Sequence, residues 1–136
     1  MKAKLLQDGP ERTFALVSET GEEVTAGLLR FASEEKLTGA HLTAIGAFQR
    51  VTLGFFDPMR KEYKPIFIEE QVELLSLVAN IARDDEGAAK LHAHVVVGKQ
   101  DGTAHGGHLL GRRFGEHNAH CRRRRVHFHG HSSVQR

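Results

Sequence analysis

The sequence predicts an α+β fold in which one main helix packs on a mostly antiparallel β-sheet. A single stretch near the N-terminus has its apolar residues at helical spacing. It is followed by a series of strand-like segments that end at turn residues. Helix and strands are therefore segregated along the chain, which favours an α+β arrangement over alternating βαβ units. The length of 136 residues predicts one domain.

The predicted strands are short segments rich in β-branched and aromatic residues, several of them with alternating polarity. Before the helix we expect strands at Lys2–Leu6 and Arg12–Ser18, and after it at 40–56, 62–68, 72–82, 91–99 and 103–110. Pro65 predicts an edge position for its strand, because proline has no N–H to donate to a neighbour. Gly106 and Gly107 predict a close approach between backbones.

The predicted helix follows a Thr-Gly-Glu-Glu stretch. Thr20 is expected to cap the helix while Glu23 reaches back to the capping residue, which is the capping-box pattern. The apolar residues that follow at i, i+4 and i+7 are Val24, Leu28 and Phe31, and they define one face of a helix. The helix is expected to end before Gly39, with its apolar face covering one face of the sheet.

Composition places the chain among globular proteins. Hydrophobic residues make up 40% and charged residues 26%. No apolar run approaches the roughly 20 residues of a membrane span, and the N-terminal stretch is too polar for a signal peptide. The single cysteine, Cys121, excludes an internal disulfide and favours the cytoplasm.

The net charge of +2 conceals a difference between two parts of the chain. Residues 1–110 carry 12 Lys and Arg against 16 Asp and Glu, a net charge of −4. Residues 111–136 carry seven Arg, no Lys and one acidic residue, a net charge of +6. We therefore divide the chain into a domain at 1–110 and an atypical Arg- and His-rich tail at 111–136.

Three interpretations of this tail remain open. It is a polyanion-binding patch, a zinc cluster, or the product of a reading-frame shift. The patch would comprise Arg122, Arg123, Arg124 and Arg125. The zinc cluster would draw on His117, His120, Cys121, His127, His129 and His131, although their spacing fits no standard zinc finger. We favour the frame shift, which implies that the last core strand is missing or replaced.

Four histidines near the end of the domain form the candidate metal site. His92 and His94 are two residues apart on a predicted strand, so both point to one face. His105 and His108 follow a Gln-Asp-Gly turn, and the returning strand brings one or both toward the first pair. Three histidines and a water form a common open zinc site. The alternative is that these histidines, like His41, are structural or lie at a subunit interface.

The domain resembles the plants-and-prokaryotes conserved (PPC) family. The resemblance lies in GEEVTAGLLRFASEEKLTGAHLTAIGAFQRVTLGFFDP, QVELLSLVANIA and LHAHVVVGKQDGTAHGGHLL, which follow one another in the family's order. It implies a helix against an antiparallel sheet and a homotrimer. It also implies a DNA-binding or regulatory role, with partner contacts near Gln71, Val72, Glu73, Leu74, Leu75 and Ser76.

The chain lacks the Arg-Gly-Arg-Pro core of an AT-hook, which the plant members use to bind the minor groove. No nucleophile or pair of carboxylates is arranged for catalysis. The sequence therefore favours a DNA-associated or regulatory binding module that is not an enzyme. The alternative is a zinc-binding protein, or a metal-dependent enzyme, that uses the histidines.

Overall fold

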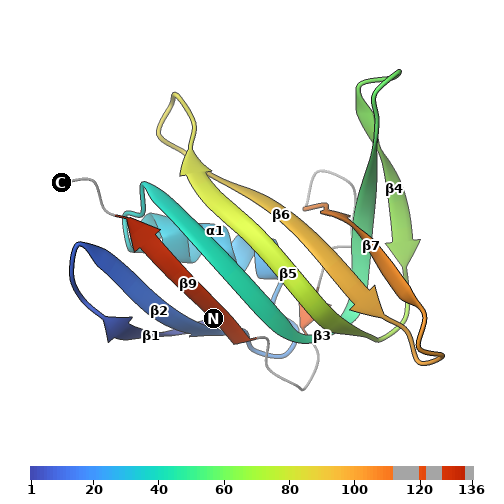
Figure 1. Ribbon diagram of the computed structural model, residues 1–136, viewed down its shortest axis with the longest axis horizontal. Coiled ribbons are helices and arrows are strands. Elements are labelled where there is room, and N and C mark those ends of the chain that lie inside the picture. Colours follow the sequence, from blue (N-terminus) through green and yellow to red (C-terminus); the bar gives the residue numbers. More distant parts are fainter. Residues whose placement is uncertain (112–119, 122–126, 134–136) are drawn as a thin grey trace.

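The computed structural model describes residues 1–111, 120–121 and 127–133. One helix, α1 (Val24–Glu34), packs on a sheet (Figure 1). The strands are β1 (Lys2–Gln7), β2 (Glu11–Val17), β3 (Gly39–Asp57), β4 (Glu62–Ile68), β5 (Val72–Arg83), β6 (Ala89–Gly98), β7 (Ala104–Leu109), β8 (His120–Cys121) and β9 (His127–Ser133). Every strand predicted from the sequence is present, with ends that differ by a few residues. The predicted α+β class is confirmed.

The sheet is antiparallel throughout its described pairings, in the order β1-β2-β9-β3-β5-β6-β7. The long strand β3 is central to it. Its first half lies between β9 and β5, and its second half pairs with β4 and β7. In Figure 1 the β3–β4 hairpin projects from the body of the sheet. Among the described residues, strand β4 pairs with β3 alone, so Pro65 occupies the edge position that the sequence predicts.

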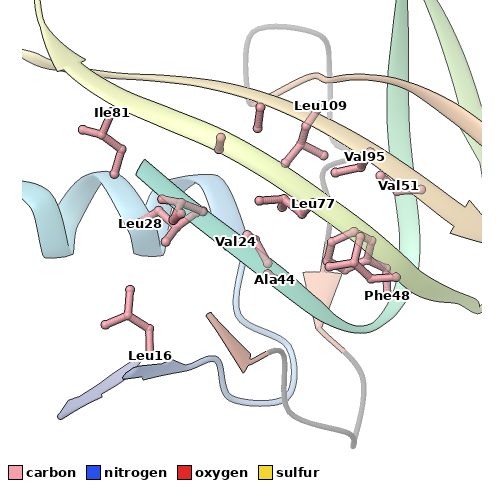
Figure 2. Packing of buried hydrophobic residues seen from close by; sticks show 14 of the residues in the cluster. Leu16, Val24, Leu28, Ala44, Phe48, Val51, Leu77, Ile81, Val95 and Leu109 are labelled. Carbon is pink, nitrogen blue, oxygen red and sulfur yellow. The ribbon is translucent and has the colours of Figure 1, made fainter. Parts of the chain in front are cut away.

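The helix covers one face of the sheet and encloses the core (Figures 1 and 2). Val24, Leu28 and Phe31 are buried, as the helical spacing predicts. They pack with alternate residues of the strands, among them Ala44, Leu77 and Val95 (Figure 2). Full burial of each large apolar side chain contributes roughly 1.5–3 kcal/mol. The inner face is thus apolar, and the next residue along each strand is left on the outer face.

The predicted capping arrangement of the helix is wrong. Glu23, not Thr20, is the N-cap residue, and its two carboxylate oxygens accept hydrogen bonds from the backbone N–H groups of Thr25 and Ala26 at 3.0 and 2.7 Å. Glutamate is less common than threonine at this position, but its carboxylate also complements the positive end of the helix dipole.

Through its described residues, the tail contributes two strands to the sheet, β8 and β9, and both pair with β3. Strand β9 lies between β2 and β3, in a register that sets His131 opposite His41 and Gly130 opposite Leu42. The last core strand is therefore supplied by the Arg- and His-rich tail itself. The Arg122–Arg125 patch lies outside the described residues. Within the described part of the chain, no helix is long and apolar enough to cross a membrane.

Candidate metal centre

Three of the four candidate histidines form one cluster on the outer face of the sheet. His92 and His94 lie on β6, and His108 on β7 is paired directly with His94. The ring centroids are 4.9 Å apart for His92 and His94, 5.0 Å for His92 and His108, and 5.7 Å for His94 and His108. One ring nitrogen from each residue can be chosen so that all three lie within 4.8 Å of one another.

The alternation of β6 explains why the first two histidines share the outer face. Ala93, Val95 and Val97 are buried against the core, so His92 and His94 point the other way. The third histidine reaches the same face because β7 returns antiparallel after a tight turn. Asp101 stabilises this turn by accepting hydrogen bonds from the backbone N–H and the hydroxyl of Thr103. These bonds lower the pKa of the Asp101 carboxyl.

His105 lies apart from this cluster. It is three residues before His108 on the same strand, so the two side chains point to opposite faces. In the register of β6 and β7 it pairs with the buried Val97. Its Nε2 lies 3.4 Å from the hydroxyl oxygen of Thr103. The four-histidine set predicted from the sequence thus separates into a group of three and a single residue.

His108 is the most enclosed member of the cluster. It is half-buried, whereas His92 and His94 are exposed. The ring of Tyr63, from β4, stacks on its ring at a centroid distance of 4.6 Å and an interplanar angle of 29°. Burial, together with the charges of the other two histidines, lowers the pKa of the His108 imidazole. This lowered pKa favours the neutral form of the ring, which is the form that binds metals.

Glycines allow the strands to approach closely at this point. His108 pairs with Gly54 on β3, and a Cβ added to the neighbouring Gly107 would lie 2.9 Å from the Gly54 carbonyl oxygen. This confirms the close approach predicted for the Gly106-Gly107 pair. A Cβ on Gly54 would itself come within 2.9 Å of a Tyr63 ring carbon. Because these glycines have no side chain, β3 and β7 can approach each other and the Tyr63 ring can lie directly over Gly54.

The residues of the cluster fit a metal ion. Three imidazoles are a donor set suited to zinc and related ions, and they leave a coordination position open. The Nδ1 atom of His108 is shielded from solvent and has no hydrogen-bond partner among the described residues. Buried ring nitrogens normally have a partner, and coordination to a metal supplies one.

A pocket of about 440 Å³ adjoins the cluster on the outer face. His94 and His108 contribute to its lining, together with Tyr63 and the apolar side chains of Phe55, Phe56, Val78 and Val96. Ligand sites of this kind are mostly apolar with a few polar groups that orient the ligand. Tyr63 was not among the predicted site residues, because only the pairing of β4 with β3 brings it to His108.

The remaining predicted residues lie elsewhere. In the Gln71–Ser76 stretch, Val72 and Leu74 are buried, while Gln71, Glu73, Leu75 and Ser76 are exposed. A register irregularity between Leu74 and Ser76 sets two consecutive exposed residues in β5. His41 forms a 3.3 Å side-chain contact from its Nδ1 to the Asn80 amide oxygen. This contact is in keeping with the structural role predicted for His41.

These features define an α+β domain with a cluster of histidines on the outer face of its sheet. Residues 6–116 match the family model of the Plants and Prokaryotes Conserved (PCC) domain. The chain belongs to this family, which is the PPC family that its sequence resembles. None of the curated proteins with which it was compared matches the chain.

Solved structures of similar proteins share the fold. The chain is 25% identical to a plant- and prokaryote-conserved protein of Pyrococcus horikoshii, with a TM-score of 0.81 over 99% of this chain and 84% of that one. It is 28% identical to a metal-containing protein of Archaeoglobus fulgidus, with a TM-score of 0.78 over 98% and 85%. It is 27% identical to a candidate DNA-binding protein of Ralstonia eutropha, with a TM-score of 0.79 over 90% and 79%.

Proposed function

We propose that this protein binds a divalent transition metal, with zinc as the first choice, through His92, His94 and His108. The observation that carries the proposal is the convergence of three ring nitrogens within 4.8 Å of one another. The lowered pKa of His108 supports it, because less energy is needed to keep that ligand neutral. The similar protein of Archaeoglobus fulgidus, which contains a metal, gives independent support.

The test is the metal content of the purified protein, followed by zinc titration of the metal-free form. We expect about one metal ion per chain, and a large loss of zinc affinity in His92→Ala, His94→Ala and His108→Ala. His105→Ala is the matched control, because His105 lies on the opposite face of the same strand. If His105→Ala weakens zinc binding as much as the other substitutions, the three-histidine site is wrong. Failure of zinc to bind the native protein would overturn the proposal altogether.

Association with DNA is the second proposed function, in keeping with a regulatory binding module. It is supported by the similar Ralstonia protein, which is considered a candidate for DNA binding. The acidic residues outnumber the basic ones within 1–110, so Arg122–Arg125 would provide the phosphate contacts. Such contacts carry no base specificity of their own.

The DNA proposal predicts salt-dependent binding that requires the four arginines. Replacing all four with Gln should abolish binding and flatten its dependence on salt, whereas Arg60→Gln with Lys61→Gln should change neither. Substitution is preferable to deletion of the tail, because β9 is part of the sheet. The proposal fails if the native protein shows no salt-dependent binding, or if the quadruple variant binds as well as the native one.

We also propose that the chain acts in the cytoplasm as a homotrimer, and that regulatory partners contact Gln71–Ser76. Exposed apolar side chains on the outer face support self-association. Phe55 is 64% exposed, Leu75 53% and Val78 49%. An apolar surface of this kind is unusual for a monomer and marks a contact site.

A further inference from the structure

A second pocket, of about 590 Å³, lies where the start of α1 meets the start of β6 and the end of β7. It exists because β7 leaves β6 after the His94–His108 pair and continues along β3. The β6 edge from Ala89 to Ala93 consequently has no strand partner among the described residues. His108 and Tyr63 line this pocket, but His92 and His94 do not. The volume is in the range of small-molecule sites.

The walls of this pocket are largely apolar. Ala26 and Leu29 come from α1 and Leu91 from β6, while Leu109 ends β7 and Leu110 follows it. Leu109 and Leu110 are buried, and the Leu110 N–H donates a hydrogen bond to the Thr52 carbonyl of β3. A preformed apolar wall of this kind selects a ligand with a short hydrocarbon body.

A lysine among the lining residues of the pocket offers a partner for an anion. Lys90 is the one cationic side chain among the residues that line the pocket, and Glu23 is the one carboxylate. Both oxygens of Glu23 already accept hydrogen bonds from the helix N–H groups, so its charge is offset there. The Lys90 ammonium lies 3.3 Å from Asp84, which holds it at the rim with further N–H donors available. The edge of β6 from Ala89 to Ala93, which has no strand partner among the described residues, offers further backbone N–H donors.

From these observations we propose that the pocket binds a small carboxylate with an apolar chain. The carboxylate lies at the rim against Lys90 and the edge of β6. The chain lies between Leu29 of the helix and Leu91, Leu109 and Leu110 of the sheet. This site shares His108 with the proposed metal centre, but it includes neither His92 nor His94 and does not require the metal.

The experiment is an NMR titration of the full chain with butyrate and hexanoate, in metal-free and zinc-loaded forms. We expect saturable shifts at the amides of Lys90, Leu91 and Gly111, with hexanoate bound more tightly than butyrate and hexanamide bound much more weakly. Lys90→Gln should weaken hexanoate binding about tenfold, the typical cost of losing a charged hydrogen bond. Leu29→Trp should fill the pocket and abolish binding.

The matched control is Lys99→Gln. Lys99 is paired with Glu70 far along the sheet and does not line the pocket, so its loss should leave the affinity unchanged. The inference is overturned if no shift saturates, if Lys99→Gln acts like Lys90→Gln, or if the shifts appear only with zinc and centre on His94 and Val96. If the protein fails to bind zinc but still binds hexanoate, the pocket proposal stands and the metal proposal fails.

Discussion

Tyr63 is the side chain that holds His108 in place. Metal-binding histidines usually donate their second ring N–H to a carboxylate or carbonyl, which orients the ring. Tyr63 stacks on the ring of His108 at a centroid distance of 4.6 Å, which fixes the plane of that ring. Aromatic stacking therefore contributes to orienting this histidine, and it leaves Nδ1, which has no hydrogen-bond partner among the described residues, free for a metal.

Removing the stacked ring should weaken the proposed zinc site. We expect Tyr63→Ala to reduce zinc affinity by about tenfold or more, the usual effect of removing a group that orients a ligand. Tyr63→Phe keeps the ring and should bind zinc like the native protein. The measurement is competition with a chelator of known affinity. Equal losses in both variants would show that the hydroxyl matters and not the stacking.

The protonation of His108 should make the metal-free protein less stable in acid. Its pKa is lowered in the folded state from the ordinary value of 6.5, mainly by burial. The unfolded chain therefore takes up a proton more readily, and stability falls as the pH drops through and below that ordinary value. Urea unfolding at pH 7.5 and 5.5 should show a smaller pH effect in His108→Gln. An unchanged pH effect would contradict the assignment, as would an NMR titration of His108 above 6.5.

At the scale of the elements, glycines allow β7 to approach β3 closely enough to pair with it. A Cβ at Gly107 would lie 2.9 Å from a backbone oxygen, while one at Gly106 would come no closer than 3.4 Å to its neighbours. Gly107→Ala should therefore cost about 1–3 kcal/mol of unfolding free energy, the usual range for overpacking. Gly106→Ala is the control and should cost clearly less. Denaturant unfolding measures both, and equal costs would show that β7 adjusts its path.

The composition of strand β9 bears on the hypothesis that the tail is the product of a reading-frame shift. Phe128, Gly130 and Ser132 are the residues in register with Ala44, Leu42 and Ala40 of β3, so only one of them is a large apolar residue. The frame-shift hypothesis predicts that the coding DNA after Leu110, read in another frame, specifies a β-rich ending. Stop codons or a polar sequence in both other frames would rule it out.

At the scale of the whole molecule, the outer face of the sheet would form the contacts of the proposed homotrimer. Phe55 is exposed near the histidines and would be covered in the proposed homotrimer. We expect light scattering to give three times the mass of one chain, and Phe55→Glu to shift the protein to monomers. Leu6→Glu, on the exposed strand β1, is the control and should leave the mass unchanged. A native monomer would contradict the trimer.

Much of the fold was predictable, because local periodicity reports which face of an element is buried. The spacing of Val24, Leu28 and Phe31 predicted the helix, and Pro65 predicted an edge strand. The capping residue was not predictable in the same way, since Thr20 and Glu23 compete for the same N–H groups. The course of the chain between β2 and α1 decides between them, and Glu23 makes the bonds.

The sequence by itself determined that His92 and His94 share a face, because a strand repeats every two residues. The same two-residue repeat puts His105 and His108 on opposite faces, and this follows from the sequence once both residues are assigned to one strand. Only the tertiary structure decided that His108 joins the pair, because the register of β6 and β7 is a long-range property. It also brought Tyr63 and the second pocket to His108, since β3 must pair with both β4 and β7 there.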